Sequence, residues 1–127
     1  MYRVLIADDD ILMREALHVM IAKDSAFKVV SMTGTGESAV RACKEDVIDI
    51  VFMDMQMPVM GGVEATRAIR EQERTGGRKP VPIVAMTANA FNEDRERALA
   101  AGMDGFMTKP IDLAKLKRIL EEYLAKP

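Results

Sequence analysis

The stretch VLIADDD at residues 4–10 joins four apolar residues to three consecutive aspartates. A short apolar run that ends abruptly in charge is typical of a strand buried on both faces of a parallel sheet. Two further runs, at residues 50–53 and 83–86, end in the same way at Asp54 and Thr87. The sequence therefore predicts three buried strands, each of which ends at a polar side chain.

Shorter runs at residues 29–32 and 105–107 predict two more strands, and the segments between the strands repeat apolar residues at helical spacing. We expect helices at residues 11–23, 36–45, 62–74, 92–101 and 112–125. The first carries an apolar stripe, which consists of Met13, Ala16, Leu17, Met20 and Ile21.

The ends of these helices also carry signals. Asp10 and Asp112 stand where a side chain caps the first turn of a helix, and Gly102 stands where a left-handed residue ends one. The polar segment at residues 75–80 predicts a surface loop.

Five strands that alternate with five helices predict an α/β fold, in which right-handed crossovers connect parallel strands. We expect one flavodoxin-like domain over residues 1–127, an open five-stranded parallel sheet with helices on its two faces. Two strand orders are plausible for so small a sheet, and 2-1-3-4-5 is the better fit. This order makes strands 1 and 3 neighbours at the switch point, where ligands bind outside the carboxyl ends of the strands.

The composition limits the function classes. Hydrophobic residues make up 49% of the chain and charged residues 30%, as in ordinary globular proteins. The net charge of −2 gives no field that favours direct binding of nucleic acid or of a membrane surface. No apolar run reaches the roughly 18 residues of a membrane span. The single cysteine, Cys43, suits a reducing compartment, so we expect a cytoplasmic location.

Polar side chains gather at the expected carboxyl ends of the strands. They are Asp8 and Asp9 after strand 1, Asp54 after strand 3, Thr87 after strand 4 and Lys109 after strand 5. Crowded carboxylates raise one another's pKa unless a cation joins them, and oxygen ligands without a histidine favour Mg²⁺. An anion that bridges Mg²⁺, a lysine and a hydroxyl is most naturally a phosphoryl group, and Asp54 is its candidate nucleophile.

Each of these residues has a structural explanation when it is considered alone. An aspartate after a strand is commonly a turn or capping residue, and Asp10 needs no other role. The conjunction of all these positions at one edge of the sheet favours a binding site.

Four motifs carry a resemblance to a known family. They are VLIADDD at residues 4–10, VFMDMQMPVMGG at 51–62, VPIVAMTANA at 81–90 and GFMTKP at 105–110. In this order and spacing, they resemble the CheY-like receiver domains of bacterial two-component response regulators. The resemblance covers nearly the whole chain.

The resemblance implies a phosphorylation site. Asp54 would accept a phosphoryl group as an aspartyl phosphate, from a histidine kinase or a histidine phosphotransfer domain. Asp9 would bind Mg²⁺ directly and Asp8 largely through water, and the carbonyl group of Gln56 would complete the protein ligands. The resemblance thus implies a signalling domain, whose only catalysis would be its own phosphorylation and dephosphorylation.

The resemblance also implies a switch. Thr87 would hydrogen-bond a phosphoryl oxygen for which Ala88 leaves room, and Lys109 would pair with the phosphoryl group. The Lys109-Pro110 bond is expected to be cis, and Phe106 occupies the position of the switch aromatic. We expect an output partner or a second copy of the chain to bind the face formed by helix 4, strand 5 and helix 5.

The chain departs from the family pattern at Gly61, where many members have an aspartate. Residues from strand 3 onward are similar to the receivers of hybrid sensor kinases. The opening third is more similar to receivers that precede a DNA-binding domain, so the subfamily stays open.

Three other classes are alternatives. An aspartate-based Mg²⁺ phosphatase or phosphotransferase would pair Asp8 with Asp10, but it needs a cap domain for which no loop here is long enough. A flavodoxin-like FMN carrier needs a Ser/Thr-rich loop after strand 1, where this chain has aspartates. A docking module that is not phosphorylated would not need the family's five site positions, and this chain fills all five.

Overall fold

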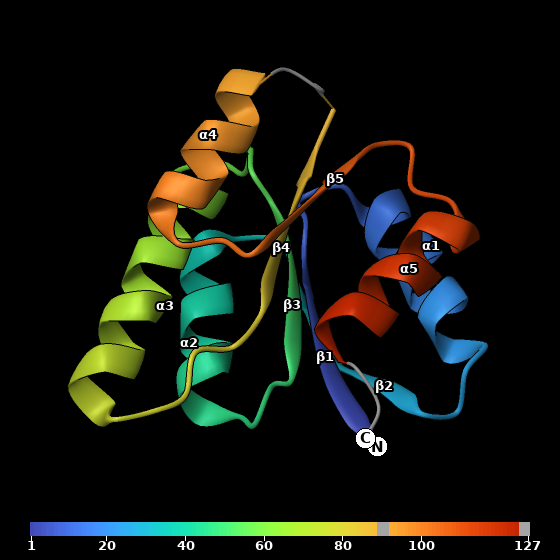
Figure 1. Cartoon of the computed structure of the whole chain (residues 1–127), viewed down its shortest axis with the longest axis horizontal. Coiled ribbons are helices and arrows are strands. Elements are labelled where there is room, and N and C mark those ends of the chain that lie inside the picture. Colours follow the sequence, from blue (N-terminus) through green and yellow to red (C-terminus); the bar gives the residue numbers. More distant parts are fainter. Residues whose placement is uncertain (89–91, 125–127) are drawn as a thin grey trace.

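A computed structural model describes residues 1–88 and 92–124 of the chain (Figure 1). Strands and helices alternate along it in the order β1 (Tyr2–Ala7), α1 (Ile11–Ala22), β2 (Phe27–Thr33), α2 (Gly36–Glu45), β3 (Ile50–Asp54), α3 (Gly62–Gly76), β4 (Ile83–Thr87), α4 (Asn92–Ala101), β5 (Gly105–Thr108) and α5 (Leu113–Tyr123). In this part of the chain, no helix is long and apolar enough to cross a membrane.

The five strands form one sheet of order β2-β1-β3-β4-β5, and every neighbouring pair is parallel. Helices α1 and α5 cover one face, and α2, α3 and α4 cover the other (Figure 1). The predicted flavodoxin-like fold and its strand order are therefore confirmed, and β1 and β3 are neighbours at the switch point.

The core consists of two apolar layers, one on each face of the sheet. Alternate residues of β1 enter opposite layers, since Val4 and Ile6 pack beneath α1 and α5, whereas Leu5 and Ala7 pack beneath α2 and α3. All residues of β3 and β4 are buried, as their uninterrupted apolar sequence predicts. The central strands are held from both sides, so the polar residues at their ends have fixed positions.

The predicted helix ends of α1, α4 and α5 are confirmed. The Asp10 carboxylate accepts from the backbone N–H groups of Leu12 and Met13, and Asp112 accepts from Lys115. Gly102 has a positive φ of 107° at the end of α4. Helix α5 ends at Tyr123, and residue 125, with which we expected it to end, lies outside the described residues.

One residue of the predicted stripe on α1 is misplaced. Leu17 and Ile21 are buried, and Met13 and Met20 pack against them, but Ala16 is exposed. The prediction for Ala16 is wrong because this residue lies about 100° around the helix from Leu17, outside the face that α1 turns to the sheet.

Helix α3 is longer than the sequence predicted. It continues through Thr75 to Gly76 and ends at Gly77, whose φ of 67° is left-handed. Residues 75 and 76 were therefore wrongly expected in a loop, because either of two adjacent glycines can end a helix and the second one does. The loop that follows is fixed to α2, since the Arg78 guanidinium donates to the carbonyl groups of Cys43 and Lys44 at 2.6 and 2.8 Å.

Candidate functional site

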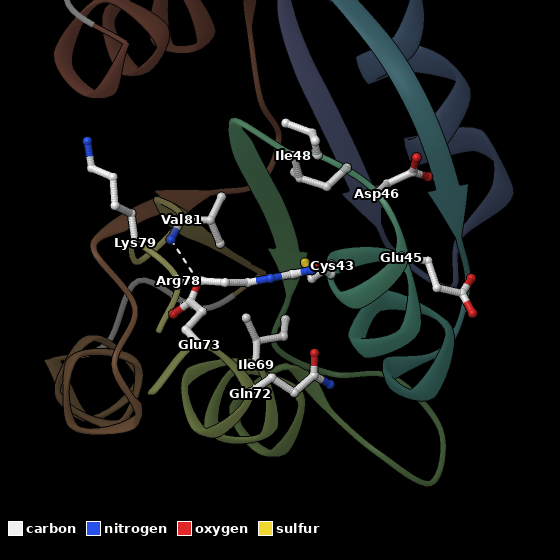
Figure 2. A pocket seen from close by; sticks show the side chains of 11 residues that line it. Cys43, Glu45, Asp46, Ile48, Ile69, Gln72, Glu73, Arg78, Lys79 and Val81 are labelled. Atoms are coloured by element: carbon white, nitrogen blue, oxygen red, sulfur yellow. Dashed lines mark hydrogen bonds between the residues drawn. The ribbon is translucent and has the colours of Figure 1, made fainter. Parts of the chain in front are cut away.

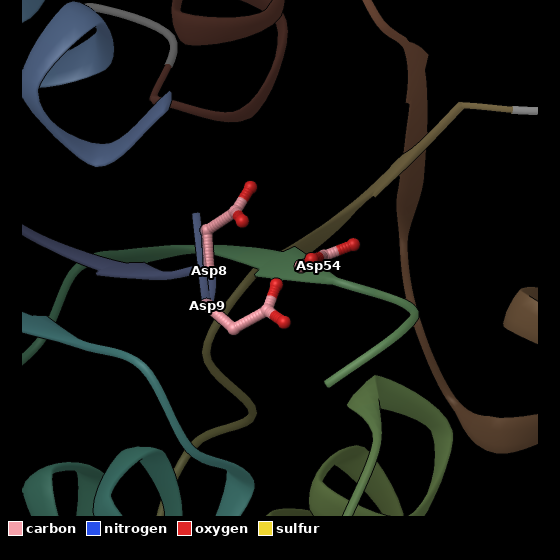
Figure 3. A group of neighbouring side chains, drawn as sticks. All are labelled: Asp8, Asp9 and Asp54. Carbon is pink, nitrogen blue, oxygen red and sulfur yellow. The ribbon is translucent and has the colours of Figure 1, made fainter. Parts of the chain in front are cut away.

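Three carboxylates meet at the carboxyl ends of β1 and β3 (Figure 3). Asp8 and Asp9 follow β1 directly, and Asp54 is the last residue of β3. One oxygen atom from each lies within 4.8 Å of the others. Asp8 is fully buried, Asp54 is 5% exposed and Asp9 is exposed. The sheet thus brings together the three acidic residues that the sequence singled out.

The carboxylate of Asp8 has a partner at each of its oxygen atoms. Its Oδ1 atom accepts from the backbone N–H of Asp10 at 2.9 Å. The Oδ2 atom is buried, and the Lys109 Nζ atom lies 2.9 Å from it as an ion pair. A carboxylate oxygen has two lone pairs, so a bound cation or its water could still bind to Oδ2 beside the ammonium.

Lys109 places its charge between two carboxylates. Its Nζ atom lies 2.9 Å from Asp8 and 3.7 Å from Asp54. Burial lowers the pKa of Lys109, but the two carboxylates outweigh it and hold that pKa above its ordinary value. One ammonium against three carboxylates leaves the cluster with excess negative charge. The all-oxygen donor set therefore fits a hard divalent cation.

Burial raises the pKa of Asp54 to about 7. The backbone N–H of Gln56, which donates to Asp54 Oδ1 at 3.2 Å, opposes this shift, and so does Lys109. The charge of Asp8 adds to it. A divalent cation at the cluster would favour the ionised form of Asp54, because it offsets the repulsion between the carboxylates.

Thr87 lies beside this cluster on the next strand. Asp54 pairs with Met86 in the sheet, so Thr87 stands one residue further along β4, where it is 2% exposed. Its carbonyl group accepts from the backbone N–H of Lys109 at 2.7 Å, and the Lys109-Pro110 peptide bond is cis, as expected. Ala88 follows Thr87 and is exposed.

Phe106 occupies β5, where it pairs with Ala85 and packs, half-buried, against the layer beneath α3 and α4. The guanidinium carbon of Arg95 on α4 lies 5.1 Å from the centroid of its ring. This distance is within the range of a cation–π interaction, which the sequence did not predict.

Sequence reasoning also missed Arg14. This residue of α1 donates from Nη1 to the carbonyl oxygen of Asp8 at 2.8 Å, and so it supports the backbone of the acidic cluster. Its position, one helical turn after Asp10, could have suggested a side chain directed back toward the site.

A pocket elsewhere in the described structure contrasts with this cluster. It has a volume of about 300 Å³ and lies between α2 and α3, where Cys43 and Ile69 are among its lining residues (Figure 2). Burial raises the pKa of the Cys43 thiol to about 12, so the thiol stays protonated and unreactive. The acidic cluster is therefore the candidate site.

The sequence also matches a family model. The model of the response regulator receiver domain matches residues 4–121. The chain belongs to this family. It is thus a receiver domain of two-component signalling, and the resemblance drawn from the four motifs is confirmed.

Relatives of this receiver domain occur within sensor kinases. The chain is 37% identical over 118 residues to the sensor protein GacS of Pseudomonas syringae pv. syringae, an alignment that covers 93% of this chain and 13% of GacS. The chain therefore spans a small part of the curated relatives that it matches.

Two solved structures are similar over nearly the whole chain. One is the receiver domain of a sensor histidine kinase from Pseudomonas aeruginosa PAO1, with a magnesium ion coordinated in its active site cleft. It is 34% identical with a TM-score of 0.85, and 98% of each chain is covered. The other is the receiver domain of the Saccharomyces cerevisiae response regulator Ssk1, in complex with the histidine phosphotransfer protein Ypd1. It is 32% identical with a TM-score of 0.88, and 96% of this chain and 88% of that chain are covered.

Proposed function

We propose that this receiver domain accepts a phosphoryl group on Asp54, with Mg²⁺ bound beside it. The observation that carries the proposal is the cluster itself: three carboxylates within 4.8 Å, with Lys109 between two of them. Such a cluster binds a cation and, through the cation and the lysine, an anion. Asp54 lies centrally, on the strand between Asp8 and Thr87.

The donor set suits Mg²⁺, the ion in the cleft of the related receiver from Pseudomonas aeruginosa. Asp9 and Asp54 would bind the ion directly, with the carbonyl group of Gln56, and Asp8 would act through water. Asp8 is already held by Asp10 and Lys109, whereas the exposed Asp9 carboxylate makes no hydrogen bond or ion pair within the described residues. This difference supports the assignment of the direct ligand to Asp9.

Phosphorylation would be a displacement at phosphorus. An Asp54 carboxylate oxygen forms the new bond, the bond from phosphorus to the donor's histidine nitrogen breaks, and the imidazole leaves with that electron pair. Mg²⁺ supplies charge neutralisation for the transferred group, and Lys109 pairs with its oxygens. Asp54 must be ionised to attack, so a cation that lowers its pKa from about 7 also activates it.

The response would pass through Thr87 and Phe106. A phosphoryl oxygen on Asp54 would accept a hydrogen bond from the Thr87 hydroxyl, with space at Ala88, and Phe106 on the adjacent strand would then move. The output face would be α4, β5 and α5, on which a partner or a second copy binds.

The donor would dock on apolar side chains near the site. Ile11 and Leu12, at the start of α1, are 63% and 80% exposed, and Val59, which follows β3, is 96% exposed. Val59 also has a φ of 65°, which is strained for a β-branched residue. Exposed apolar groups beside a reactive centre suit a phosphoryl donor that is itself a protein, such as a histidine kinase or a histidine phosphotransfer domain.

Intact mass with acetyl phosphate and Mg²⁺ tests the proposal. We expect a gain of one phosphoryl mass on the parent chain, with no gain on Asp54→Ala or on the parent in EDTA. If Asp54→Ala gained as much phosphoryl mass as the parent, a residue other than Asp54 would be the acceptor.

A further inference from the structure

The direction of the Asp9 carboxylate depends on the backbone. The Asp9 side chain is exposed, and within residues 1–88 and 92–124 its carboxylate takes part in no hydrogen bond or ion pair. Asp8, by contrast, is fixed through its own carboxylate by Asp10 and Lys109. Whatever aims Asp9 toward Asp54 must therefore act on the main chain that carries it.

Arg14 acts on that main chain. Its Nη1 atom donates to the carbonyl oxygen of Asp8 at 2.8 Å, and this carbonyl belongs to the peptide unit that joins Asp8 to Asp9. The first turn of α1 fixes the base of the side chain, because the Arg14 N–H donates to the Asp10 carbonyl at 3.0 Å. A planar guanidinium bonded to a carbonyl restrains the orientation of the peptide plane.

The loop after β2 encloses the guanidinium from the other side. A Cβ atom at Gly34 would lie 2.6 Å from Arg14 Nη1 and 3.7 Å from the Cα atom of Asp9. Gly34 does not have a positive φ, so its missing side chain provides space and not backbone freedom. The loop is fixed in place, since Asp8 N–H donates to the Thr33 carbonyl at 3.0 Å and Thr33 Oγ1 donates to the Thr35 carbonyl at 3.0 Å.

We infer that Arg14 is a positioning residue for the metal site, and that Gly34 is the residue that leaves room for it. Arg14 holds the peptide between Asp8 and Asp9 so that the Asp9 carboxylate points toward the cation. Because its hydrogen bond is to a carbonyl and not to a carboxylate, it leaves the ligand oxygens available. The inference rests on the proposed function, since it assigns a role toward the cation of that same site.

Mg²⁺ affinity of the full chain, measured by calorimetric titration, tests the inference. Arg14→Met keeps most of the apolar stem and removes the donor, and Gly34→Ala keeps the arginine but displaces its guanidinium. We expect both variants to bind Mg²⁺ about tenfold more weakly, as is usual when a group that orients a metal ligand is lost. Lys23→Met is the matched control, because it removes one positive charge from the opposite end of α1, and it should bind within about twofold of the parent.

Two further measurements separate positioning from other roles. The unfolding temperature of Gly34→Ala in EDTA should be close to that of the parent. If Gly34 had only a structural role, weak Mg²⁺ binding would come with a lower unfolding temperature. The sign of the effect is a second criterion, because removing a positive charge close to the cation would by itself strengthen Mg²⁺ binding, whereas lost positioning weakens it. The loss in affinity should also remain in about 0.5 M salt, where the Debye length is only a few ångströms.

Several outcomes would overturn the inference. They are Mg²⁺ binding by Arg14→Met as tight as or tighter than that of the parent, or within twofold of it, and normal binding by Gly34→Ala beside weak binding by Arg14→Met. A parent chain that binds no Mg²⁺ would overturn the proposed function as well. If the parent binds and Asp9→Ala does not, the metal site stands and only the role of Arg14 is at issue.

Discussion

The two ends of the sheet treat buried charge in opposite ways. At the amino ends of β4 and β5, Glu73 is buried, and one of its carboxylate oxygens accepts from Arg70. The other oxygen accepts from the backbone N–H of Val81 (Figure 2). Asp104 there accepts from Arg70 and from the N–H of Ile83. At the carboxyl ends of β1 and β3, by contrast, three carboxylates lie together (Figure 3). Lys109 is the cation that pairs with Asp8 and Asp54, and the Asp9 carboxylate takes part in no hydrogen bond or ion pair within the described residues.

The difference separates charge that stabilises the fold from charge that serves a ligand. The hydrogen-bonded carboxylates at the amino end connect α3 to the strands and to the turn after α4. The carboxylates at the other end repel one another, which destabilises the folded state until a cation or a proton neutralises them. The same kind of substitution should therefore have opposite effects at the two ends.

Asp54→Asn should produce the largest change. It should abolish phosphorylation, because the amide has no nucleophilic oxygen anion. Without metal it should also stabilise the fold at pH 7.5. The folded-state pKa of Asp54 is raised from 3.8 to about 7, a shift that corresponds to at most about 4 kcal/mol.

The sign of this effect follows from the protonated form. Since the raised pKa means that the folded state prefers protonated Asp54, this contribution to stability is present below pH 3.8 and is lost as pH rises through about 7. Urea unfolding in EDTA at several pH values should show a steeper loss from pH 4 to 7.5 in the parent than in Asp54→Asn. If the stabilities of the parent and of Asp54→Asn changed in parallel with pH, the raised pKa of Asp54 would be contradicted.

Glu73→Gln makes the matching change at the amino end and should destabilise the fold by about 3 kcal/mol. A glutamine has one acceptor oxygen, so it cannot accept from both Arg70 and Val81, and its NH₂ group must face one of these donors. The same urea measurement checks the prediction. A variant as stable as the parent would remove the contrast between the two ends.

Mg²⁺ should raise the stability of the parent by about 2.7 kcal/mol at a concentration 100 times its Kd. Asp9→Ala should lose this response. Asp10→Ala should keep it and lose only about 1 kcal/mol through its cap of α1. Thermal melts of both variants with and without Mg²⁺ are sufficient. If Asp9→Ala kept the response to Mg²⁺ and Asp10→Ala lost it, the assignment of the direct ligand to Asp9 would be wrong.

Most of the fold and the first layer of the site could be predicted from the sequence. Buried strands such as 50–54 are continuous apolar runs, and the polar residue that ends each run, such as Asp54 or Thr87, reaches the site through parallel pairing alone. Arg14 and Gly34 could not be found in this way, because their meeting depends on how the loop after β2 packs on α1. The contact of Arg95 with Phe106 depends on the rotation of α4, whose sequence has no clear apolar face.

The smallest predicted effect concerns this last contact. Arg95 is exposed, and a cation–π interaction at such a site stabilises by about 0.5–1 kcal/mol. If it holds Phe106 in its unphosphorylated position, then Arg95→Ala should shift the switch toward the activated position by a factor of about 2–5, since 1.4 kcal/mol corresponds to tenfold. Amide shifts around Phe106 in the unphosphorylated variant should then move part of the way toward those of the phosphorylated parent. Arg41→Ala on α2, outside the proposed output face, is a control for the loss of an exposed positive charge. Shifts that stay with the unphosphorylated parent would show that Arg95 only covers the ring. Such a result would restrict the switch to the residues at the carboxyl end of the sheet.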